Sequence, residues 1–108
     1  MEKEINEMLQ ELGVTANYMG YYHSSYAVSL AVRDREYLLS VTKSLYPEVA
    51  RHYNTSATAV ERNIRTVVSY VWNHSQGTLM EIARCRLSDK PTASQFIAIL
   101  AAHLKDLY

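Results

Sequence analysis

The chain has 108 residues, which is enough for one domain and too few for two. Apolar residues make up 48% of it, so a packed core is expected rather than disorder. The formal net charge is zero, and a single cysteine, Cys85, excludes an internal disulfide, which suits the cytosol. The acidic N-terminus does not resemble a signal peptide, and no apolar run approaches the length of a membrane span.

The spacing of apolar residues is helical throughout and predicts an all-α, compact bundle of about six helices in a single domain, residues 1–108. The first helix is expected at 2–12, with Gly13 as its stop. A second is expected from about 21 to 32, after the tyrosine-rich stretch 18–26. A third is expected from about 35 to 45.

Two further helices are expected on either side of a short turn. Pro47 favours the first turn of a helix, so a short one is expected from there to about Tyr53. The following Asn54, Thr55 and Ser56 are typical of a turn and a helix cap. A long helix is then expected at about 57–73.

The C-terminal third contains one weak and one strong helix signal. Gly77 is expected to close the connection after the long helix, and a short helix is expected around 79–84. A capping box from Thr92 to Gln95 predicts the start of the last helix. Its apolar stripe consists of Phe96, Ile97, Leu100, Leu104 and Leu107.

The long helix has two distinct faces. Helical geometry places Val60, Ile64, Val67 and Val71 on one side as a buried stripe. The opposite side carries Thr58, Arg62, Arg65 and Ser69, with Glu61 beside them. An amphipathic helix with a solvated outer face would show the same pattern, and the spacing alone does not separate the two interpretations.

Two helices joined by a short turn over residues 46–73 fit a helix-turn-helix, whose second helix enters the major groove of double-stranded DNA. Arg can bridge guanine O6 and N7, Glu can accept from cytosine N4, and Thr can contact base or phosphate. Charge also permits this function, because residues 33–65 carry a net +2 although residues 1–12 carry a net −3. The candidate DNA-binding residues are Ser56, Thr58, Glu61, Arg62, Arg65 and Ser69.

Several segments resemble a known family when taken in order. They are residues 39–50 with Leu45-Tyr46-Pro47, then Val60-Glu61-Arg62-Asn63-Ile64-Arg65, then Lys90-Pro91-Thr92. From about residue 5 to 107 the chain resembles the C-terminal DNA-binding effector domains of the stage zero sporulation protein A family, the response regulators that initiate sporulation.

The resemblance implies a six-helix transcription-regulator domain that binds short promoter boxes, often as tandem copies that allow self-association. It implies that Glu61 and Arg62 face base edges, that Arg65 contacts base or phosphate, and that Thr58 contacts the backbone. It also implies a bacterial, cytoplasmic protein that associates with the nucleoid when bound.

The chain departs from the family pattern at three places. Ala59 stands where the family usually has an arginine that reads guanine. Residues 73–88 match the family's promoter-activating surface poorly, which argues against contact with RNA polymerase. The chain begins directly at the effector domain, so it is expected either to stand alone without a receiver domain or to be part of a longer protein.

No enzyme, metal site or cofactor is expected. The histidines have no metal-ligand spacing with Cys85 or with paired carboxylates, and no phosphate loop, nucleophile elbow or acid pair is present. The alternative function is a helical protein-interaction module that has kept the fold and lost or weakened DNA binding. Zero net charge and Ala59 motivate it, and the tyrosines at 18–26 serve either core packing or self-association.

Overall fold

The computed structural model describes residues 1–106, and that part of the chain is helical without any strand. Its six α-helices are α1 (Glu2–Glu11), α2 (Met19–Arg33), α3 (Tyr46–His52), α4 (Ala57–His74), α5 (Gln76–Ala83) and α6 (Ala93–Lys105). Two short pieces, η1 (Arg35–Leu39) and η2 (Val41–Leu45), connect α2 to α3. The prediction of an all-α bundle of about six helices is confirmed.

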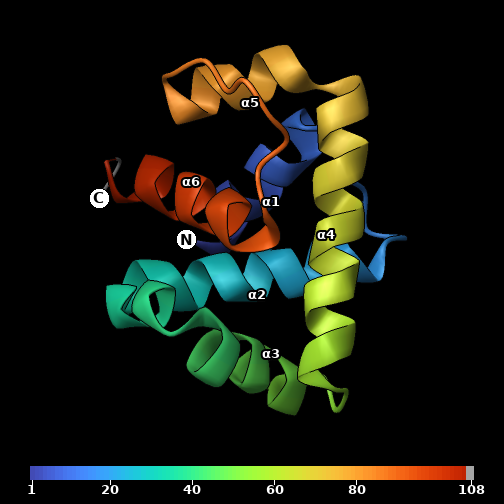
Figure 1. The fold of residues 1–108 in the computed structure, drawn as a ribbon, viewed down its shortest axis with the longest axis vertical. Helices are drawn as coiled ribbons and strands as arrows, with labels where there is room; N and C mark the ends of the chain where they lie inside the picture. Colours follow the sequence, from blue (N-terminus) through green and yellow to red (C-terminus); the bar gives the residue numbers. More distant parts are fainter. Residues whose placement is uncertain (107–108) are drawn as a thin grey trace.

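The central helix of the bundle is α2, which packs against α1, α3, α4 and α6 (Figure 1). The longest helix, α4, runs across the ends of α2 and α6, with α3 near its start and α5 after its end. This arrangement leaves one side of α4 exposed at Thr58, Arg62 and Arg65, whereas Ser69 is half-buried. No helix within residues 1–106 has both the length and the apolar character needed to cross a bilayer.

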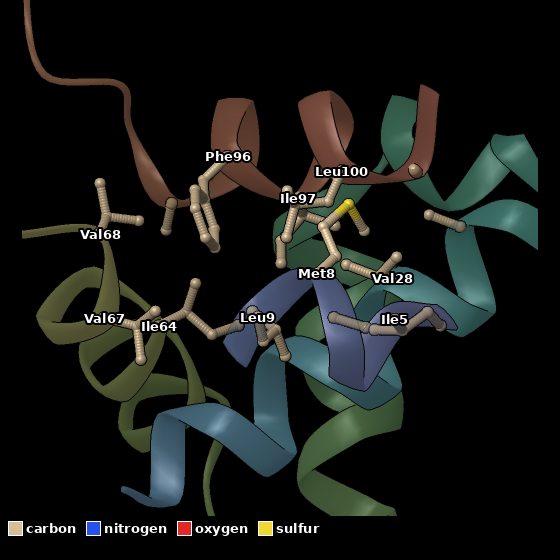
Figure 2. Close-up of a cluster of buried hydrophobic side chains, with 14 of the residues drawn as sticks. Ile5, Met8, Leu9, Val28, Ile64, Val67, Val68, Phe96, Ile97 and Leu100 are labelled. Carbon is tan, nitrogen blue, oxygen red and sulfur yellow. The ribbon is translucent and has the colours of Figure 1, made fainter. Parts of the chain in front are cut away.

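The core lies where α1, α2, α4 and α6 meet (Figure 2). Ile5 and Leu9 of α1, Ile64 of α4, and Phe96 and Leu100 of α6 are each fully buried. Burial of a side chain of this size contributes about 1.5–3 kcal/mol to stability. The core therefore fixes α4 through one stripe of apolar residues and leaves its other side free.

Gly20 sets the distance between α2 and α4. A Cβ at this position would lie 2.4 Å from the Asn63 carbonyl oxygen and 2.4 Å from Cγ2 of Val67. Because atoms do not approach so closely, only glycine permits this crossing. The contact anchors the middle of α4 on the start of α2.

The helix predicted at 35–45 is wrong as a single element. The chain forms a 3-10 turn over η1 and a π-helical turn over η2, separated at Ser40, whose φ of −143° and ψ of 57° are not helical. The Asp34 carboxylate accepts from the Glu36 amide and caps the first piece. One straight helix is thus broken so that Leu45 is buried while Leu39 stays 86% exposed.

The connection after α4 is shorter than predicted. Gly77 does not close it, because this residue lies in the first turn of α5, which begins at Gln76 rather than near residue 79. Only Ser75 separates α4 from α5, and its hydroxyl donates to the Leu12 carbonyl at 2.9 Å. That bond joins the end of α4 to the end of α1.

The start of α6 agrees with the prediction. The Thr92 hydroxyl accepts from the Gln95 amide at 3.1 Å, and the Thr92 amide donates to the Gln95 side chain at 2.9 Å. Both bonds of the predicted capping box are therefore present. Leu107, predicted as the last residue of the apolar stripe, lies outside the described residues.

Candidate nucleic-acid interface

Helices α3 and α4 pack on one another and are joined by residues 53–56. Asn54 adopts a left-handed conformation with φ of +54°, which asparagine tolerates better than most residues. The Ser56 hydroxyl caps α4 by accepting from the Ala59 amide at 3.1 Å. Both helices and their turn agree with prediction, whereas the use of the pair to bind DNA stays a prediction.

The two predicted faces of α4 are present. Val60, Ile64, Val67 and Val71 are 0–2% exposed. On the opposite side Thr58, Arg62 and Arg65 are exposed and Ser69 is half-buried. Four of the six predicted site residues therefore form one outward stripe, with Glu61 beside it and Ser56 at its N-terminal end.

The two arginines of the stripe differ in their surroundings. Within residues 1–106 the Arg62 guanidinium has neither an ion pair nor a hydrogen bond. The Arg65 guanidinium instead donates to the Glu61 carboxylate at 3.0 Å, one turn earlier. Such a surface pair contributes only about 0.3–0.5 kcal/mol, so it orients Arg65 without immobilising it.

A shallow hollow of about 210 Å³ lies next to Glu61. Its walls include Thr42 of η2, the buried Tyr46 of α3, and Thr92 and Ser94 at the start of α6. Burial and the negative charge of Glu61 raise the pKa of Tyr46 to about 12, so its hydroxyl stays neutral at physiological pH. The hollow thus presents hydroxyl groups together with the Glu61 carboxylate.

The sequence prediction missed one cation beside the stripe. The Lys90 ammonium group donates to the Ser69 hydroxyl at 3.0 Å, although the two residues are far apart in the chain. The Lys90-Pro91-Thr92 motif contributes to the family resemblance, which does not connect it with Ser69. No helical periodicity links it to α4, so only the folded chain shows the contact.

His23 of α2 is a buried side chain that contacts α4 through Asn63. Its ring is 1% exposed, and Nδ1 lies 3.4 Å from the Asn63 amide nitrogen. Burial lowers the pKa of His23, because the charged ring loses its hydration. The neutral His23 ring is therefore part of the packing that holds α4 against α2.

Two other histidines are parts of aromatic clusters. The His52 ring stacks on Tyr26 with ring centres 4.0 Å apart, and the His74 ring stacks on Tyr70 at 4.3 Å. Within residues 1–106 no group of three or more His, Cys, Asp or Glu residues is placed to hold a metal ion.

The fold and the exposed stripe together are those expected of a helical effector domain. Comparison with known families agrees with that class. Residues 5–104 match the family described as "Sporulation initiation factor Spo0A C terminal". The match covers nearly the whole chain, and the chain belongs to this family. The family consists of non-enzymatic, DNA-binding effector domains of transcription regulators.

Proposed function

We propose that this chain binds double-stranded DNA sequence-specifically, with residues 46–73 as a helix-turn-helix and α4 in the major groove. Arg62 and Glu61 contact base edges, Arg65 contacts base or phosphate, and Thr58, Ser56 and Ser69 contact the backbone. The proposal follows from membership of a DNA-binding family together with the exposed stripe of α4.

The observation that carries the proposal is the Arg62 side chain. A guanidinium that faces solvent and has no partner within residues 1–106 contributes little to folding. It keeps all five N–H donors available for a ligand. A planar group of this kind suits the paired acceptors of guanine in the major groove.

The biological setting is proposed on the family's behaviour. The chain acts in the bacterial cytoplasm on promoter boxes, and tandem boxes bring copies of it side by side. No contact with RNA polymerase is proposed.

A binding selection from random duplex DNA, run at two salt concentrations, tests the proposal. The expected result is an enriched motif, with affinity that falls steeply as salt rises. The double variant R62A/R65A should lose the motif while its helical content stays unchanged. Failure of the wild-type chain to retain any duplex at low salt contradicts the proposal.

A protein-interaction module is the second candidate. It is favoured by exposed apolar side chains on the tyrosine-rich start of α2, where Met19 is 54% and Tyr22 is 39% exposed. This function predicts that DNA is not retained and that M19S/Y22S abolishes binding to a partner protein. The same selection separates the two candidates, because only one of them enriches a DNA motif.

A further inference from the structure

The segment that leads into α6 runs alongside α4. Lys90 reaches Ser69, while Thr92 and Ser94 line the hollow beside Glu61. Ser69 and Glu61 are eight positions apart, so the segment follows α4 over about 12 Å. It therefore borders the stripe proposed to bind DNA.

The position of Lys90 is well defined by its neighbours. Pro91 is buried and restricts the backbone of the preceding residue to extended conformations. Thr92 is held by the capping box at the start of α6. Lys90 thus extends from a rigid base, and its bond to Ser69 directs the ammonium group toward α4.

The charge of Lys90 is not neutralised by the fold. Its ammonium group bonds to a neutral hydroxyl, and it forms no ion pair with a carboxylate within residues 1–106, Asp89 included. The side chain is exposed. Lys90 is thus an accessible cation beside a helix that we propose to lie in the major groove. It is positioned to bind an anion that lies outside the groove.

We infer that Lys90 binds a backbone phosphate of the DNA strand that flanks α4. This inference rests on the proposed DNA binding and extends it beyond the helix-turn-helix. A lysine binds phosphate as a point charge, whatever the neighbouring base. Lys90 then fixes the position of α4 on the duplex without reading sequence.

The test is fluorescence anisotropy of the full chain with a selected duplex and with an unrelated duplex. Lys90→Ala should weaken both complexes by the same factor. The slope of log K against log salt should become shallower by about 0.9. The loss of affinity between about 50 and 200 mM salt should therefore be about threefold smaller than for the wild-type chain. Lys90→Arg keeps the charge and should restore most of the affinity.

A matched control removes one charge at a distance from α4. Lys3 of α1 has a side chain that is 83% exposed, and Lys3→Ala should leave both affinity and slope unchanged. The inference is overturned if Lys90→Ala behaves like Lys3→Ala, or if its loss is confined to the selected duplex. If the wild-type chain binds neither duplex, the proposed function fails as well, which distinguishes the two failures.

Discussion

Arg65 and Glu61 are bound to each other across one turn of α4, with 3.0 Å between the guanidinium nitrogen and the carboxylate oxygen. Glu61 is the only acidic residue of this helix and lies beside its exposed stripe. The Arg65 guanidinium attracts DNA phosphates and the Glu61 carboxylate repels them, so one contact joins two groups of opposite effect. If α4 binds DNA as proposed, Glu61 opposes non-specific binding to phosphates and can still accept from a cytosine amino group.

Glu61→Gln should separate these two effects. Removal of the carboxylate should tighten binding to unrelated duplexes, because repulsion is lost and Arg65 is released. Discrimination at one base pair should fall by about 1–3 kcal/mol. Anisotropy with matched and mismatched duplexes measures both quantities. Uniformly weaker binding to every duplex would contradict a specificity role for Glu61.

Ala59 offers a gain-of-function prediction. It lies in the first turn of α4 and is partly exposed, at the position where the family resemblance implies an arginine. Ala59→Arg should favour sites with an additional guanine by about 1–3 kcal/mol over sites without it. A second selection with this variant reads the change directly. Ala59→Lys is the control for charge alone, and equal gains on all sequences would rule out base recognition.

Gly20 and Gly77 form a matched pair for a stability test. Gly20→Ala should destabilise the fold by about 1–3 kcal/mol, because the new methyl group overlaps α4. Gly77→Ala meets nothing within 4 Å and lies inside α5, so it should stabilise by up to about 1 kcal/mol. Urea unfolding measures both, and equal effects at the two positions would contradict the close crossing of α2 and α4.

His23 makes stability depend on pH. Burial lowers its pKa in the folded chain below the ordinary value of 6.5, which the unfolded chain keeps. As the pH falls through about 6.5 the unfolded chain gains a proton that the folded chain resists, so this contribution to stability is lost. Above that pH the contribution is constant.

Urea midpoints measured between about pH 8 and pH 5 check this dependence. His23→Gln should flatten the slope, whatever its effect on stability at pH 8. His52→Gln is the control, since His52 is exposed and stacks on Tyr26. Equal slopes in wild type and His23→Gln would show that His23 does not titrate in this way.

Local signals in the sequence were enough for the helices that carry the candidate site. Pro47, Asn54 and Ser56 each act on their own backbone neighbourhood, so α3, the turn after it and the start of α4 were predictable. The apolar period of α4 likewise predicted which face is buried. These features need no knowledge of distant parts of the chain.

Features set by tertiary packing were not predictable in this way. The break at Ser40 separates the exposed Leu39 from the buried Leu45, whereas a helical wheel treats residues 35–45 as one helix. Gly77 resembles a helix stop, yet it lies in the first turn of α5, which packs against α4 and α6. The contact of Lys90 with Ser69 joins two segments whose spacing has no period.

The central claim is that the exposed stripe of α4 binds DNA. An NMR titration of the isotope-labelled chain with duplex DNA at low and at moderate salt tests it most directly. Backbone amide shifts should concentrate in residues 46–73 and 90–94, should reverse with salt, and should leave α1 unchanged. Absence of shifts at low salt, or shifts that concentrate on α1 and α5, would contradict the claim.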